Sequence, residues 1–136
     1  MKKIILLFAL ISVTTLTLQA QNTKRTWKQY GLSFTAPSVM KVTQNDAVSF
    51  VAEAEDLHIS IEVLDYEGLS PETMAATLGQ LAGELGMDAS SDIGELGLTT
   101  LEGIYIEGAV DGIPTILVLL YDTESNIALL SSIVYA

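Results

Sequence analysis

Three polar residues at alternate positions carry the side-chain types of a hydrolytic site. His58, Ser60 and Glu62 supply a base, a nucleophile and a carboxylate within the alternating segment LHISIEVLD. Side chains two residues apart on a strand are separated by about 7 Å, whereas a nucleophile and its base need a hydrogen bond of about 3 Å. We therefore predict a polar sheet face here, and the sequence assigns no catalytic residue.

Two acidic segments carry the oxygen ligands that calcium prefers. Glu53, Glu55 and Asp56 cluster at a predicted hairpin tip, and Asp122 and Glu124 lie in a second loop. Calcium takes about six to eight oxygen ligands, and neither segment has the regular acidic loop with a central glycine. We expect solvated turns, while a weak calcium site assembled from the two loops stays open as an alternative.

Other metal and cofactor sites lack their ligands in this sequence. The chain has one histidine and no cysteine, so nitrogen and thiolate zinc sites are not expected. The glycine-containing segments GELG and GAVDG precede no capped helix, as a phosphate-binding loop would. We predict no cofactor and no bound metal.

Two residue pairs would suit contact with a partner or packing within the domain. Gly79 and Gly83 lie one helical turn apart, and such small residues either permit close packing inside the domain, are merely tolerated, or let a partner approach. Trp27 and Tyr30 would form either an exposed aromatic surface or, as we expect, a staple over the sheet.

The charge distribution excludes one class of partner. The chain has 17 acidic and 6 basic residues, a formal net charge of −11, and no lysine or arginine follows Lys41. Nucleic-acid binding depends on cationic side chains that displace counterions from phosphates. We therefore expect no nucleic-acid partner.

The first twenty residues have the form of a secretory signal peptide. Two lysines precede an apolar stretch from Ile4 to Val13, and Leu18 and Ala20 precede the predicted cut. We predict a leader at residues 1–20, a single domain at residues 21–136, and a periplasmic or secreted location. Without cysteine the domain has no disulfide.

Alternation predicts strands in the first half of the mature chain. Strands are expected at residues 30–37, 40–43, 47–54 and 57–65, with Glu55 and Asp56 at a hairpin tip and Val48 on one face with Phe50 and Ala52. A helix is expected next, because Ser70 is placed to cap it and Pro71 suits a first turn. Its apolar stripe and its end follow from Met74, Leu78, Leu81, Leu85 and Gly86.

The C-terminal quarter is the most apolar part of the mature chain. A weak strand at residues 93–99 and a firm one at 103–110 lead to Asp111-Gly112, a strong hairpin signal. The runs 114–121 and 127–135 are too short for a membrane helix, which needs about twenty apolar residues. They are apolar on both faces, so we expect central strands with cover on each side and no membrane segment after leader removal.

These elements predict an α+β fold. We expect a mostly antiparallel sheet of about six to seven strands with one main helix, Pro71 to Leu85, packed on it. The chain stops at Ala136, directly after a strand. We therefore expect either residues 21–29 or a second copy of the chain to cover the face that the helix leaves bare.

Three segments resemble the PsbP-like superfamily of α/β/α sandwich domains, in its secreted bacterial branch. They are YGLSFTAP, LSPETMAATLGQLAGELGM and GIYIEGAVDGIPTILVLLYDTESNIALLSSIVY. The resemblance implies a domain used for binding or assembly, without a common catalytic site or a required cofactor.

We therefore expect an exported, non-enzymatic domain that binds or assembles in the cell envelope, with an envelope protein or with itself. The alternatives are an acidic calcium- or small-ligand-binding module and a small hydrolase.

Overall fold

The computed structural model describes residues 22–65, 68–98 and 100–136, so the predicted leader at residues 1–20 lies outside it. The described residues form ten strands and one helix. In chain order these are β1 (Asn22–Trp27), β2 (Leu32–Pro37), β3 (Lys41–Asn45), β4 (Ser49–Ala54), β5 (Leu57–Leu64), α2 (Met74–Glu84), β6 (Met87–Ala89), β7 (Gly94–Leu96), β8 (Glu102–Val110), β9 (Ile113–Asp122) and β10 (Ile127–Tyr135).

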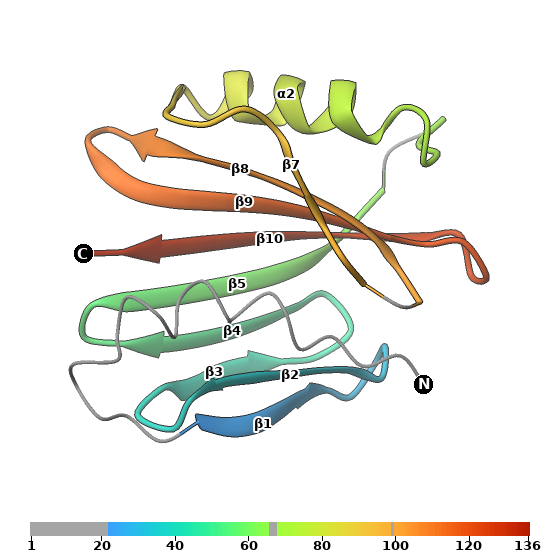
Figure 1. Ribbon diagram of the computed structural model, residues 1–136. Coiled ribbons are helices and arrows are strands. Elements are labelled where there is room, and N and C mark those ends of the chain that lie inside the picture. Colours follow the sequence, from blue (N-terminus) through green and yellow to red (C-terminus); the bar gives the residue numbers. More distant parts are fainter. Residues whose placement is uncertain (1–21, 66–67, 99) are drawn as a thin grey trace.

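The strands form one large sheet and one separate hairpin (Figure 1). The eight-stranded sheet has the order β3-β4-β5-β10-β9-β8-β6, and β7 also pairs with β8. The hairpin consists of β1 and β2 alone. Every pairing in both sheets is antiparallel. Helix α2 lies along β8, at the end of the large sheet that is distant from β3 (Figure 1).

The expectation of an α+β fold with six to seven strands is wrong. The fold is dominated by its sheets, since the described chain has ten strands against one short helix. Two strands were not expected, β1 at Asn22–Trp27 and β6 at Met87–Ala89. Neither carries a clear apolar alternation, and each forms because a neighbouring strand with a clearer strand pattern, β2 or β8, offers it backbone partners.

Strand β9 is central in the core, as its apolar pattern predicts. Ile116, Val118 and Leu120 face one hydrophobic cluster, which includes Trp27 and Phe34 of the hairpin. The residues between them face a second cluster under α2, namely Leu117, Leu119 and Tyr121. Because successive side chains point to opposite faces, β9 contributes to both cores, and its two faces have two different covers.

The β1–β2 hairpin covers the sheet face opposite α2. Trp27 and Phe34 are 0% and 1% exposed, and both pack in the same cluster as Ile59 and Ile61 of β5. Side chains also tie β1 to the main chain near β3. Arg25 donates to the carbonyl of Met40 at 2.8 Å. Part of the expected segment, residues 22–29, thus supplies cover through Trp27, and Gln21 lies outside the described residues.

Helix α2 is shorter than expected, running from Met74 to Glu84 instead of Pro71 to Leu85. Thr73 takes the N-cap position, and its hydroxyl oxygen accepts a hydrogen bond from the Ser70 amide at 2.9 Å. Ser70 itself does not cap the helix, because the intervening residues form a turn closed by the Thr73 amide and the Ser70 carbonyl. Gly86 follows with a φ of 70°, as predicted for a helix end.

The buried stripe of α2 also differs at its C-terminal end. Met74 and Leu78 are buried as expected, but the stripe continues through Ala82. Leu85 is 49% exposed. It is the C-cap residue, where the chain has begun to turn toward β6, so it lies beyond the part of the helix that packs on the sheet.

The predicted turns of two hairpins are confirmed, and the predicted placement of one residue, Val48, is wrong. Asp111 and Gly112 both have positive φ, 52° and 80°, in the turn between β8 and β9. The β4–β5 hairpin pairs Ala54 with Leu57 around the predicted tip. Val48, expected to share a strand face with Phe50 and Ala52, is 70% exposed while those two residues are buried, because it lies in the turn before β4.

One helix is described, and it is not long and apolar enough to cross a membrane.

Candidate functional site

One sheet face is covered over only part of its width. Helix α2 packs on β6, β8 and β9. The same face continues across β10, β5, β4 and β3, where the strand register places polar and half-buried side chains. We call this uncovered part the open face. It is defined by Lys41, Val51, Glu53, His58, Ser60, Glu62, Ser132 and Val134.

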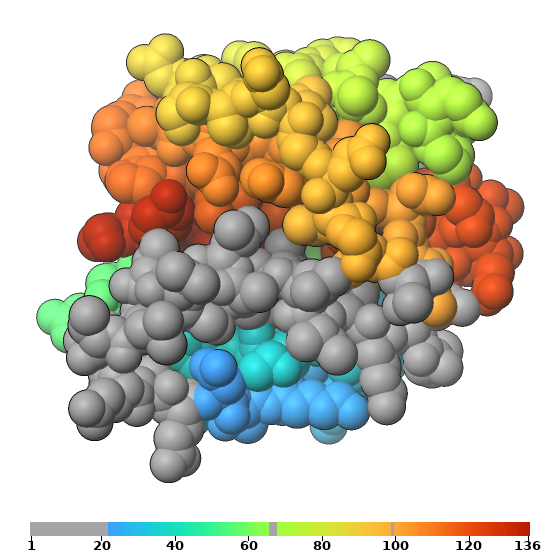
Figure 2. All heavy atoms as spheres, in the orientation of Figure 1, coloured from blue at the N-terminus to red at the C-terminus, as the bar shows by residue number. Residues whose placement is uncertain are grey.

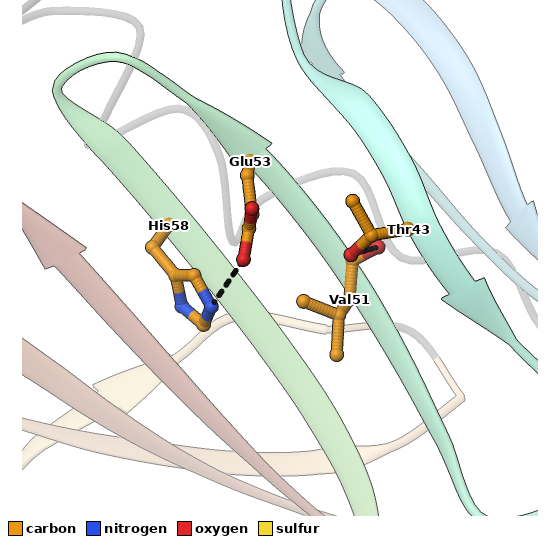
Figure 3. Close-up of polar contacts among 4 residues, drawn as sticks. All are labelled: Thr43, Val51, Glu53 and His58. Atoms are coloured by element: carbon orange, nitrogen blue, oxygen red, sulfur yellow. Dashed lines mark hydrogen bonds and ion pairs between the residues drawn. The ribbon is translucent and has the colours of Figure 1, made fainter.

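A histidine and a carboxylate meet on the open face. His58 on β5 and Glu53 on β4 are direct cross-strand partners, and their side chains point toward one another (Figure 3). His58 Nε2 lies 3.2 Å from Glu53 Oε1, with side-chain exposures of 44% and 50%. Exposed pairs of this kind contribute at most about 1 kcal/mol to stability. The pair therefore holds two neighbouring side chains in place and adds little to stability.

The three residues with hydrolase-like side chains share this face without forming a triad. His58, Ser60 and Glu62 lie in a column along β5, at the roughly 7 Å spacing of alternate strand residues. His58 Nε2 contacts Glu53 on the neighbouring strand. The cross-strand partners of Ser60 are Val51 and Ser132. The fold brings the three residues onto one surface, and neither described cross-strand partner of Ser60 is a base.

The two acidic loops lie at opposite ends of the sheet. Tyr135, at the end of β10, pairs with Leu57 beside the β4–β5 tip, whereas Ile127, at its start, pairs with Asp122. The length of β10, roughly 25 Å for nine extended residues, therefore separates the loops (Figure 1). The alternative prediction, a calcium site assembled from both loops, is therefore wrong.

The Asp122 carboxylate of the second loop is also engaged within that loop. Asp122 accepts hydrogen bonds from the Glu124 amide and the Ser125 hydroxyl, both at 3.0 Å. These contacts shape the β9–β10 turn. Within residues 22–65, 68–98 and 100–136, no group of three or more His, Asp or Glu side chains has a metal-binding arrangement.

A depression adjoins the open face at the end of β10. Its volume is about 170 Å³, and its lining includes His58, Val134, Ile113 and the tip residues Glu55 and Asp56. Ile113 is 51% exposed. Apolar and acidic side chains thus lie together at this margin, which suits contact with a protein surface more than enclosure of a small molecule.

The aromatic pair is a staple, as expected, with Trp27 buried and Tyr30 half-buried beside it. Trp27 is fully buried, and the Tyr30 ring meets it edge to face with centroids 4.6 Å apart. The Tyr30 hydroxyl donates to the Ala47 carbonyl at 3.0 Å.

The helix glycines are not used for packing within the domain. A Cβ atom at Gly79 or Gly83 would meet no described atom within 4 Å. The interpretation that these glycines permit close packing inside the domain is therefore wrong. The two other interpretations stay open: glycine is merely tolerated at these positions, or it lets a partner approach the helix.

The contact between Glu53 and His58 was missed from sequence, although its signal was present. A two-residue tip at Glu55 and Asp56 fixes the hairpin register, which places Glu53 opposite His58. No local pattern in the sequence indicated that α2 would cover only part of its sheet face.

Comparison with protein-family models, with curated proteins and with solved structures gave no match for this chain.

Proposed function

We propose that this protein is an exported, non-enzymatic domain that binds another protein of the cell envelope through the open face. One observation supports this: α2 covers only the β6–β8–β9 part of its sheet face, while β3, β4, β5 and β10 present half-buried side chains there. Val51 and Val134 are each partly accessible beside polar neighbours. Mixed aliphatic and polar surfaces of this kind are typical of protein interfaces.

The arrangement of polar groups favours binding over catalysis. A hydrolase needs a nucleophile, a base and an oxyanion site around one reacting atom. On the open face the histidine is paired with Glu53, and Ser60 lies a strand repeat away. A binding role also agrees with what the PsbP-like resemblance of the sequence implies.

Photo-crosslinking tests the assignment of the surface. The mature domain would carry a photo-reactive benzoylphenylalanine at Ser60, in the centre of the open face, or at Gln80, which is exposed on α2. Irradiation in envelope extract from the native cells is expected to give one defined adduct from Ser60. An excess of unlabelled domain should compete it away, and Gln80 should give none.

Binding by the captured protein then has to be shown with purified components. The polypeptide identified by mass spectrometry is expected to bind the wild-type domain and to lose binding to the Ser60→Arg variant, which keeps its melting temperature. Equal capture from Gln80, or binding that Ser60→Arg leaves unchanged, would refute the open face as the docking surface.

Export is a separate part of the proposal with its own test. The mature N-terminus is expected at Gln21, after removal of the leader. Mass spectrometry of the protein from periplasmic and culture fractions measures this terminus. A full-length chain retained in the cytoplasm would contradict export.

A further inference from the structure

We infer that the partner of the open face is a different polypeptide whose docking surface is rich in lysine and arginine. This inference rests on the proposed function and specifies the chemistry of the partner. It excludes a second copy of this chain as the occupant.

The open face and its margin are acidic. Glu53 and Glu62 project from β4 and β5 onto this face, and both are exposed. Glu55 and Asp56 add negative charge at the β4–β5 turn, where both line the same depression as Ile113. Lys41, the cross-strand partner of Glu53, is the one lysine or arginine on the open face.

The remaining cations of the described chain lie in another part of the molecule. Lys24 and Arg25 belong to β1, and Lys28 follows it directly. Strand β1 belongs to the hairpin that packs on the opposite face of the sheet. It lies at the end of the molecule away from α2 (Figure 2). Arg25 is also engaged, donating to the carbonyl of Met40. Among the described residues, little positive charge is therefore available to neutralise the open face.

A partner must neutralise these carboxylates if it covers them. Taking a carboxylate out of water is costly unless a cation or hydrogen-bond donor replaces the water. Guanidinium and ammonium groups satisfy Glu53 and Glu62 in that way. Aliphatic parts of the same side chains would pack on Val51 and Val134, because long cationic residues carry apolar stems.

A second copy of the chain does not meet this requirement. A two-fold interface places the same patch on both sides, so Glu53 and Glu62 of one copy would approach the same residues of the other. Each copy would bring only Lys41 against them, and the whole chain already carries a net charge of −11. Like charges across an interface oppose association.

Variants that replace glutamate with neutral glutamine test the inference. Their binding is measured to the partner identified by photo-crosslinking at position 60. The double variant Glu53→Gln plus Glu62→Gln removes two charges from the open face and preserves side-chain shape. The matched control, Glu72→Gln plus Glu84→Gln, removes two charges from exposed positions near the ends of α2. Binding is expected to weaken by at least about tenfold in the first and by less than about twofold in the control. Raising the salt concentration should weaken wild-type binding more steeply than binding by the open-face variant.

A ten-residue lysine peptide provides a probe of defined chemistry. In titrations followed by amide NMR, it is expected to shift resonances of β4, β5 and β10 in the wild type and not in the open-face variant. Shifts that survive in that variant, or that centre on α2, would contradict the inference.

The outcomes separate this inference from the proposed function. The protein crosslinked to Ser60 could bind equally well at high salt and to the Glu53→Gln plus Glu62→Gln variant. That result would support the open face as the docking surface and would refute the inference that the partner is cationic. Absence of a competable Ser60 adduct refutes the docking surface itself. Sedimentation velocity of the domain alone should show a monomer, and a dimer abolished by Ser60→Arg would refute exclusion of the second copy.

Discussion

The indole Nε1 of Trp27 donates a hydrogen bond to the main-chain carbonyl of Asp46. This contact joins the end of β1 to the turn between β3 and β4, two segments that belong to different sheets. The carboxylate of Asp46 organises the same turn, accepting hydrogen bonds from the amides of Val48 and Ser49. The hairpin and the large sheet are therefore fixed to each other at one turn.

Truncation of Trp27 should be among the most damaging single changes. The side chain is fully buried between the hairpin and the sheet, so Trp27→Ala removes large apolar contacts and leaves a cavity. The free energy of unfolding is expected to fall by about 3–5 kcal/mol. Urea denaturation followed by far-UV circular dichroism measures it. Trp27→Phe, which keeps an aromatic ring, should lose less, and a loss under about 1 kcal/mol for Trp27→Ala would mean that the hairpin does not cover the core.

The Asp46 turn should give the protein an acid-sensitive component of stability. The amides of Val48 and Ser49, and then the Gln44 side chain, hold the pKa of Asp46 below its ordinary value of 3.8. Since the pKa is lower in the folded state, this stabilisation is complete above the unfolded-state pKa and is lost as pH falls through the folded-state pKa.

Asp46→Asn isolates that component from the other carboxylates. The difference in unfolding free energy between wild type and variant is expected to be constant above about pH 5 and to shrink as the pH falls further. Trp27, the one tryptophan of the chain, reports unfolding by fluorescence in both proteins. A difference that stays constant down to about pH 2 would show that ionisation of Asp46 does not stabilise the turn.

Alanine should have opposite effects at two glycines. Gly79 lies on the outer side of α2, where an added methyl group would have no described atom within 4 Å, so Gly79→Ala should stabilise the protein by up to about 1 kcal/mol through helix propensity. At Gly108 the added Cβ would collide with the main-chain oxygen of Asp88 across the β6–β8 pair. Gly108→Ala should therefore destabilise it by about 1–3 kcal/mol. Thermal unfolding of both variants measures the contrast, and the same sign for both would be inconsistent with these environments.

Ser131 places a hydroxyl group in the core without a hydrogen-bond partner among the described atoms, which costs folding free energy. It is 0% exposed, and its hydroxyl oxygen has no hydrogen-bond partner among the described atoms. Its cross-strand partners are Ile61 and Val118. Ser131→Ala removes the unsatisfied hydroxyl, so stability should be unchanged or rise by up to about 1 kcal/mol. A loss above about 1 kcal/mol in urea denaturation would indicate that the hydroxyl makes a stabilising contact. The conservative Ser131→Thr variant serves as the control, since it retains the hydroxyl and adds volume.

Much of the local structure follows directly from the sequence. The strand predicted at residues 127–135 matches β10, and the Asp111-Gly112 hairpin has the positive φ values that its residues favour. Both signals are local: alternation sets which side chains share a face, and a turn residue sets its own backbone geometry. The same reasoning gave the Glu55-Asp56 tip and the end of α2 at Gly86.

The candidate site was harder to predict, because it depends on which parts of the sheet remain uncovered. The side chains of His58, Ser60 and Glu62 were expected on one face, and they share it. The polar partner of His58, Glu53, comes from the next strand, and the open face exists because α2 packs mainly on β6, β8 and β9. Helix boundaries also shifted, since Thr73 replaced Ser70 at the cap.

The sequence by itself determined where the chain alternates, where it turns and how its charge is distributed, because each of these depends on residues close together in the chain. The tertiary structure alone decided three other features. It made Asn22–Trp27 a covering strand, left one half of a sheet face open, and set the two acidic loops at opposite ends of β10. These features arise from contacts between distant segments, whose free energies depend on how whole faces pack together.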